Sequence, residues 1–333
     1  MNTAAQLSGM RGLAWVAAAL ALVVIVFGAF VRLSNAGLSC PDWPTCYGKL
    51  TWPTQTHEIA SANAAFPDRP VEGDKAWREQ VHRLLVGGLG IAVFALAAWA
   101  LIRRRDLGRL TIVPCFAALF IVFQALLGMW TVTLKLLPIV VAAHLLGGMT
   151  MLALLVYTAS RLTLRPMGNV ENAALRRMVI AGIVLLAVQI ALGGWTSANY
   201  AALACGTDFP TCLGQWHPPT DLASAFVLWR DIGVDYEGGV LDAPARTAIQ
   251  LAHRLGAVVV FAYGLVLAIA AIRRRESRPL GLFFGLGLFG QVMLGIRNVT
   301  MGLPLPVAVM HNALAALLLC ALLMLVVRLR RLA

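Results

Sequence analysis

The sequence predicts an all-α integral membrane protein with eight transmembrane helices, arranged as two tandem, pseudo-symmetric four-helix bundles with both termini in the cytoplasm. Three observations predict this fold class. The chain is 60% hydrophobic and 13% charged, with a mean hydropathy of +0.79, whereas soluble domains carry about 25% charged residues. Long apolar runs recur along the chain, and the second half repeats motifs of the first.

The apolar runs are each long enough, or nearly so, to cross a hydrocarbon core of about 30 Å as a helix of about 20 residues. The first run exceeds the apolar stretch of a signal peptide, and no small-residue cleavage site follows it, so we expect a retained anchor. The eight predicted spans are residues 12–31, 84–102, 110–134, 136–160, 178–198, 255–272, 279–296 and 307–327.

Arginines set the predicted orientation, because Lys and Arg accumulate in cytoplasmic segments. They gather in every second connection and after the last span: Arg103, Arg104, Arg105, Arg109, Arg161, Arg165, Arg176, Arg177, Arg273, Arg274, Arg275, Arg278, Arg328, Arg330 and Arg331. The long loops 34–81 and 199–253 then face the periplasm, and they hold twelve of the fifteen acidic residues. The net charge of +12 therefore reports topology in an inner (cytoplasmic) membrane protein, and it disfavours a nucleic-acid-binding protein, which needs a solvated basic face.

The repeat predicts two units, residues 1–165 and 170–333, each with four spans in the same orientation. Motifs recur at offsets near 167 residues. The matched pairs are Gln124 to Gly128 with Gln291 to Gly295, Leu137-Pro138 with Leu303-Pro304, His144 with His311, and His82-Arg83 with His253-Arg254.

Each unit carries two span-associated histidines near the outer face, which are His82 and His144 in the first and His253 and His311 in the second. Ionisable groups at membrane depth are costly and tend to mark function. Two imidazoles on different helices suit the two axial positions of iron in a flat macrocycle. We therefore predict two haem pockets. Ordinary interfacial histidines and a proton relay stay open, and zinc is disfavoured because a third ligand is missing.

Two further residue types accompany these histidines. Arg83 and Arg254 follow the first histidine of each pair and are candidates for binding haem propionates. Glu79 lies one helical turn before His82, whereas Gln250 holds the corresponding position before His253. A carboxylate can accept a proton or stabilise a developing cation, so Glu79 is the candidate catalytic residue. A solvated Glu at a helix N-terminus is the alternative.

Four cysteines bracket two short segments of the outer loops, which we call the cysteine loops: Cys40–Cys46 and Cys205–Cys212. Cysteines at this spacing in a turn can close a small disulfide ring, and the outer compartment favours oxidation. The disulfides are either structural or active in thiol exchange, and the sequence leaves both open. A zinc site shared by the four cysteines is disfavoured in an oxidising space.

Taken together, these residues resemble the haem A synthase family. The resemblance rests on the run RLSNAGLSCPDWPTC from Arg32 to Cys46, on the run DYEGGVLD from Asp235 to Asp242, and on Glu79 with the four histidines. It covers almost the whole chain. It implies oxidation of the C8 methyl of haem O to a formyl group, through a hydroxymethyl intermediate, to make haem A for terminal oxidases.

The resemblance also assigns the pockets. It implies that haem O, as substrate, binds between His82 and His144 beside Glu79, and that haem b, as resident cofactor, binds between His253 and His311. The implied partners are membrane lipid, a haem O synthase as donor and an electron acceptor of unknown identity; a thiol-redox protein and a homo-oligomer stay open. Two other functions remain: a bis-His dihaem electron carrier, and a membrane thiol-disulfide oxidoreductase built on the cysteine loops.

Overall fold

The computed structural model describes residues 3–166 and 172–330. Within these ranges it is helical, has no β-strand, and contains eight helices long and apolar enough to cross a membrane. The predicted topology residue Arg331 and the outermost ends of the two predicted units lie outside the described residues. The long helices are α1 (Thr3–Leu33), α3 (Gly73–Ile102), α5 (Ile112–Thr133), α6 (Pro138–Thr163), α7 (Asn172–Ala198), α9 (Ala243–Ile272), α10 (Arg278–Thr300) and α11 (Leu305–Arg328).

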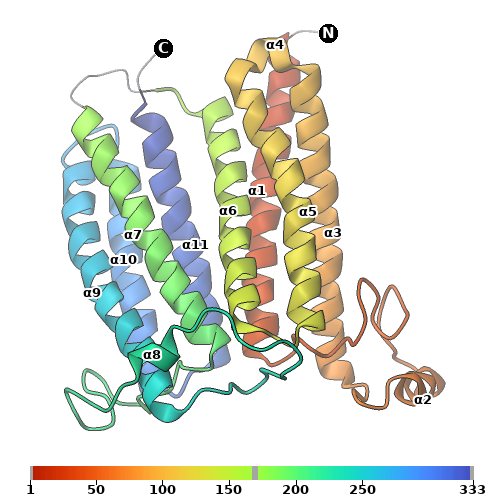
Figure 1. The fold of residues 1–333 in the computed structure, drawn as a ribbon. Coiled ribbons are helices and arrows are strands. Elements are labelled where there is room, and N and C mark those ends of the chain that lie inside the picture. The colour runs from red at the N-terminus through yellow and green to blue at the C-terminus, as the bar shows by residue number, and fades with distance from the viewer. Residues whose placement is uncertain (1–2, 167–171, 331–333) are drawn as a thin grey trace.

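The long helices pack in two groups, one from each half of the chain (Figure 1). In the first half, α1 contacts α3 and α6, and α5 contacts the same two helices. In the second half, α7 and α10 each contact α9 and α11 in the same cyclic order. The two groups meet where α6 and α1 lie against α7 and α11. The N-terminal end of α1 and the C-terminal end of α11 lie on the same side of the molecule (Figure 1).

Prolines and small backbone devices fix where several helices begin. Pro138 occupies the first position of α6, where its missing N–H costs nothing. Asp242 caps α9 by accepting a hydrogen bond from the Ala245 N–H at 3.1 Å. The turns that precede α6 and α11 both use a leucine with positive φ, Leu136 at 60° and Leu303 at 62°. The repeat is therefore visible in the backbone as well as in the sequence.

The two helices that carry His82 and His253 begin earlier than the sequence predicted, as α1 and α7 also do. Spans were expected from residues 84 and 255, whereas α3 starts at Gly73 and α9 at Ala243. Charged side chains such as Asp74 and Arg78 made the first three turns of α3 read as a loop. These helices extend beyond their apolar runs, so Glu79 and His82 lie on regular helix rather than at its start. The outer loops also contain two unpredicted short helices, α2 (Thr56–Ala65) and α8 (Leu222–Ala225), and the α3–α5 connection contains α4 (Arg104–Leu107) followed by the 3-10 turn η1 (Gly108–Thr111).

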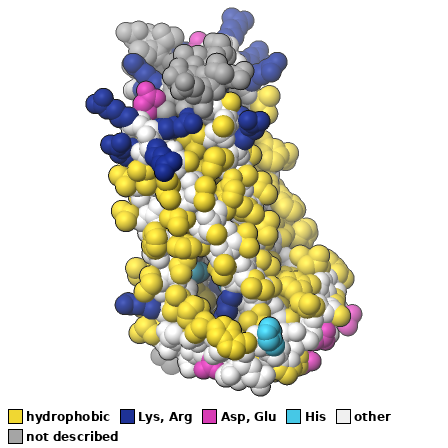
Figure 2. All heavy atoms as spheres, turned by 90° about the vertical axis from the view of Figure 1, so that its left-hand side faces the viewer, with side chains coloured by type: hydrophobic (Ala, Val, Ile, Leu, Met, Phe, Trp, Pro, Cys, Tyr) yellow, Lys and Arg dark blue, Asp and Glu magenta, His cyan; other side chains and the backbone are white. Residues whose placement is uncertain are grey.

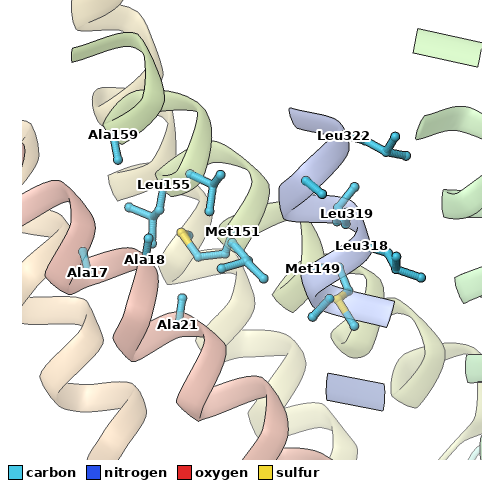
Figure 3. Close-up of a cluster of buried hydrophobic side chains, with 14 of the residues drawn as sticks. Ala17, Ala18, Ala21, Met149, Met151, Leu155, Ala159, Leu318, Leu319 and Leu322 are labelled. Carbon is cyan, nitrogen blue, oxygen red and sulfur yellow. The ribbon is translucent and has the colours of Figure 1, made fainter. Parts of the chain in front are cut away.

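The surface and the interior agree with a protein embedded in a membrane. Apolar side chains cover the middle of the face seen in Figure 2, and arginines gather around the short connections at one end. Inside, small residues let helices approach closely, as is common in membrane bundles. Figure 3 shows this seam, where alanines of α1 and α6 and leucines of α11 pack with Met149 and Met151.

Candidate functional site

Each of the four predicted histidines lies against a glycine of a neighbouring helix. A Cβ added at that glycine would lie within 3.3 Å of the imidazole Cε1, closer than an ordinary contact of 3.4–4 Å. The glycines therefore clear the space that the rings occupy. The pairs are Gly28 with His82 (2.8 Å), Gly128 with His144 (3.3 Å), Gly193 with His253 (3.1 Å) and Gly295 with His311 (3.2 Å).

Within each predicted pair the two rings lie close enough for the charge of one to affect the other: His144 affects His82, and His311 affects His253. The Nδ1 atoms of His82, His144 and His311 are buried and have no hydrogen-bond partner. Buried polar atoms are almost always satisfied in folded proteins. Rings set in glycine cradles with unsatisfied nitrogens fit a ligand that binds between them.

The donor set suits haem iron better than a free metal ion. Among the described residues, no group of three or more His, Cys, Asp or Glu side chains could hold a metal ion. Zinc and most other ions need three or four protein ligands. Two axial imidazoles are enough for iron whose other four positions are filled by a porphyrin.

Glu79 lies beneath the first cysteine loop and is 5% exposed. Its Oε2 accepts a hydrogen bond from the Cys40 N–H at 2.9 Å and lies 3.2 Å from the Ser39 hydroxyl. Its Oε1 accepts from Arg83 Nη2 at 2.5 Å, and this ion pair is almost closed to solvent. The carboxylate is thus held at both oxygens, and one turn further along α3 is His82.

Gln250 makes the equivalent contact in the second half. Its Oε1 accepts a hydrogen bond from the Cys205 N–H at 2.9 Å, and its Nε2 donates to the Ala202 carbonyl at 2.8 Å. Gln250 is 3% exposed. The residue that precedes the cysteine also differs, because Ala204 stands where Ser39 stands in the first half. The two sites therefore share a scaffold and differ in charge.

Arg83 and Arg254 hold the cysteine loops to their helices. Arg83 Nη1 donates to the carbonyls of Asp42 at 2.7 Å and Thr45 at 2.5 Å. Arg254 donates in the same way to the carbonyls of Asp208 at 2.8 Å and Thr211 at 2.9 Å. The sequence predicted that these arginines bind propionates. In this structure both arginines bind loop carbonyls, and Nη2 of Arg83 also binds Glu79. The propionate role stays a prediction.

Both cysteine loops are closed by disulfides, Cys40 to Cys46 and Cys205 to Cys212, and all four cysteines are buried. In each loop the second cysteine pairs with the residue three positions later in an isolated two-way backbone bridge.

An aspartate organises the inside of the first cysteine loop. The Asp42 carboxylate accepts hydrogen bonds from the Thr45 hydroxyl, the Tyr47 N–H and the Gly48 N–H. Burial alone would raise the pKa of Asp42, but these three donors lower it below its usual range. Asp208 makes the corresponding bond to the Gly214 N–H at 2.6 Å in the second loop.

The outer loops also bridge the two halves, which the sequence did not predict. Arg69 of the first loop forms ion pairs with Asp235 at 2.7 Å and Glu237 at 3.0 Å in the second loop. Between these acidic residues, the Tyr236 N–H donates to the Lys135 carbonyl of the first half at 3.0 Å. The segment 235–237 therefore lies against the first half (Figure 1).

The glycine partners of the histidines were also missed, although a signal for them exists in the sequence. Gly128 and Gly295 are 167 residues apart, the same offset as His144 and His311. The repeat already matches this pair of glycines, but it does not show that they face the histidine rings. Nothing in the sequence marks which glycine faces which ring, because that depends on how the helices are rotated about their axes.

Comparison with known proteins agrees with this geometry. Residues 11–323 match the COX15-CtaA family model, described as a cytochrome oxidase assembly protein. The chain is 45% identical to the Heme A synthase of Shewanella oneidensis over 306 residues, which cover 90% of this chain and 91% of that protein. It is 28% identical to the Heme A synthase of Caulobacter vibrioides over 92% of this chain and 91% of that one.

A third relative, the Heme A synthase of Shouchella clausii, is 27% identical over 96% of this chain and 98% of its own length. The family match begins in α1 and ends in α11. The chain therefore belongs to the COX15-CtaA family of cytochrome oxidase assembly proteins.

Proposed function

We propose that this protein is a haem A synthase, which oxidises the C8 methyl of haem O to a formyl group through a hydroxymethyl intermediate. Residues 1–165 form the unit that receives haem O between His82 and His144. Residues 170–333 form the unit that holds haem b between His253 and His311. The names of the curated relatives and the two pairs of cradled histidines support this assignment.

The observation that carries the proposal is that Glu79 in the first unit and Gln250 in the second make the same contact. Each accepts the backbone N–H of the first cysteine of its loop at 2.9 Å, so both side chains occupy the same place in their units. At this position the first unit has a carboxylate and the second a neutral amide. A site that merely stores an electron has no need of this difference, whereas oxidation of a methyl group releases protons and passes through electron-poor carbon.

In this mechanism the chain orients the substrate and manages charge. His82 and His144 hold haem O from two sides, and Glu79, one turn from His82, accepts a proton or stabilises positive charge at the reacting edge. Arg83 holds Oε1 of that carboxylate, which keeps Oε2 on the side of Cys40 and Ser39. Haem b supplies one-electron transfer when bound. The hydrated aldehyde formed by the second oxidation loses water without a separate catalyst.

The arginine-rich connections support an orientation in the inner membrane with the corresponding ends of the helices in the cytoplasm and the cysteine loops in the periplasm. Haem O then reaches the first unit at the periplasmic side, with a haem O synthase as its donor. The cysteine loops cover both pockets, and a thiol-redox partner would have to displace a loop to reach its buried disulfide.

The reciprocal variants Glu79→Gln and Gln250→Glu test the function. Each is expressed with a haem O source, and the haems of the purified protein are extracted and identified by mass. Glu79→Gln should retain haem b and accumulate haem O with little haem A, because the pocket remains while its carboxylate is lost. Gln250→Glu is the matched control and should still make haem A. Full haem A output from Glu79→Gln would contradict a catalytic role for this residue.

The same extraction distinguishes the two alternatives. A dihaem electron carrier would contain haem b alone, even in the presence of haem O. A thiol-disulfide oxidoreductase would lose all activity when Cys40 and Cys46 are both replaced by serine. Continued haem A formation in that double variant would exclude the thiol enzyme and support the haem A synthase.

A further inference from the structure

The second site has a side-chain partner for its first histidine that the first site lacks. Gln189 lies on α7, one turn before Gly193, the glycine that faces the His253 ring. Its Nε2 lies 3.0 Å from Nδ1 of His253 and donates to the carbonyl of the same residue at 2.9 Å. The amide thus contacts both the ring and the backbone of His253.

The corresponding position of the first half is apolar. Gly28 faces the His82 ring on α1 as Gly193 faces the His253 ring on α7, so the residue one turn earlier is Val24. Val24 is 9% exposed and has no polar group to offer. Nδ1 of His82 is buried without a hydrogen-bond partner. The first histidines of the two pairs therefore differ in the group behind the ring.

The second histidines do not show this difference. Nδ1 is buried and unpaired in both His144 and His311. For Nδ1, the difference between the two sites is thus limited to His82 and His253, and it comes from the neighbouring helices α1 and α7. His311 also has a side-chain contact, because Gln291 Nε2 lies 3.3 Å from its Nε2.

A partner on Nδ1 changes what an imidazole does as a ligand. When Nε2 binds iron, Nδ1 carries the proton and needs an acceptor. Oε1 of Gln189 is buried without a partner. A half-turn of the amide gives up the bond to the His253 carbonyl and supplies the acceptor for Nδ1. Such a bond fixes the ring and raises the basicity of the ligand, and loss of partners of this kind typically lowers metal affinity by about 10- to 100-fold.

We propose that Gln189 is a positioning residue that makes the second pocket a permanent haem site, and that Val24 leaves the first pocket able to release its haem. The proposal rests on the proposed function and deepens it. A resident haem must stay through many reactions, whereas a substrate haem must enter as haem O and leave as haem A. A histidine ring held by a hydrogen bond at Nδ1 suits the resident haem, and a ring without such a bond suits the substrate haem.

The test uses Gln189→Met, which removes the polar end and keeps an unbranched side chain, and Gln189→Glu, which restores an acceptor. The full-length proteins are purified with their haem, and transfer of haem b to apomyoglobin is timed. Gln189→Met should lose haem b about tenfold faster than the wild type, and Gln189→Glu should restore slow loss. A tenfold preferential loss of affinity for the ferric form would also raise the midpoint potential of haem b by about 59 mV.

Val24→Gln is the matched variant of the first site and should slow the release of haem from that pocket, with haem A retained on the purified protein. Unchanged haem b transfer and unchanged midpoint potential in Gln189→Met would overturn the proposal, since a purely structural amide would move neither once the protein is folded. Helix content by circular dichroism controls for folding. Wild-type protein that contains no haem b would instead overturn the proposed function, so the two failures are distinguishable.

Discussion

The glycine beside His82 offers a prediction that the structure makes quantitative. A Cβ added at Gly28 would lie 2.8 Å from Cε1 of His82, about 0.6 Å closer than the lower limit of an ordinary contact at 3.4 Å. The Gly28→Ala change must therefore displace the ring by roughly this amount. Catalytic and binding groups need to stay within about 0.5 Å of their productive position, and a displacement near 1 Å can cost about 100-fold in rate.

We expect Gly28→Ala to lower haem A formation by about 10- to 100-fold. Alanine is a better helix former than glycine by about 1 kcal/mol, so loss of helix stability cannot explain such a decrease. Gly12→Ala is the matched control, because Gly12 lies on the same helix and a Cβ there meets no atom within 4 Å. The assay measures the ratio of haem A to haem O in extracts at equal amounts of folded protein.

Wild-type haem ratios in Gly28→Ala would refute the idea that this glycine sets the position of His82. Equal losses in Gly28→Ala and Gly12→Ala would refute it as well, because the effect would then belong to the helix and not to the contact.

Two predictions concern the outer loops. Arg69→Ala should increase hydrogen exchange in the segment around Asp235 and Glu237. The free energy of unfolding should fall by less than about 1 kcal/mol per ion pair, because both pairs are partly exposed. Unchanged exchange would mean that the ion pairs do not hold the loops together. A hydrogen bond from Lys49 lowers the pKa of Glu58 from 4.5 to about 2, so the stability it contributes is present above pH 4.5 and is lost as pH falls towards 2. Exchange in α2, corrected for its intrinsic pH dependence, should rise over that interval in the wild type and show no such step in Glu58→Gln.

Hydropathy and arginine placement were enough to predict the eight helices, because a membrane restricts a spanning segment to one backbone form. The starts of α3 and α9 were missed because their first turns contain charged residues. Their hydropathy is therefore as low as that of a loop. Residue Asp74 on α3 is an example. Helix propensity and capping, which decide such turns, give weaker signals than a long apolar run.

The candidate site was predictable as far as the repeat reached. His82, His144, His253 and His311 were found because they recur at matched positions. Gln189 was not found, because its counterpart in the first half is the apolar Val24. A polar residue without a polar counterpart stands out only when its position is known to face the haem pocket. That knowledge requires the rotation of each helix about its own axis.

The bridge between Arg69 and the segment 235–237 was beyond sequence reasoning for another reason. Loops have no periodicity, so nothing in the order of residues shows which charges of two long loops will meet. The same is true of the two arginines that hold the cysteine loops, Arg83 and Arg254. Their position after a histidine predicted that they bind haem propionates, and that role stays a prediction. In the structure both arginines bind loop carbonyls, and Arg83 also binds Glu79.

The shared contact of Glu79 and Gln250 with a cysteine N–H bears on how two such sites can diverge. The codons of glutamate and glutamine differ only in their first base. A single nucleotide exchange therefore inserts or removes a carboxylate while the acceptor oxygen, and the loop that depends on it, stays in place. In a duplicated bundle of this design, evolution can make one half reactive and the other unreactive through variants that all keep the fold.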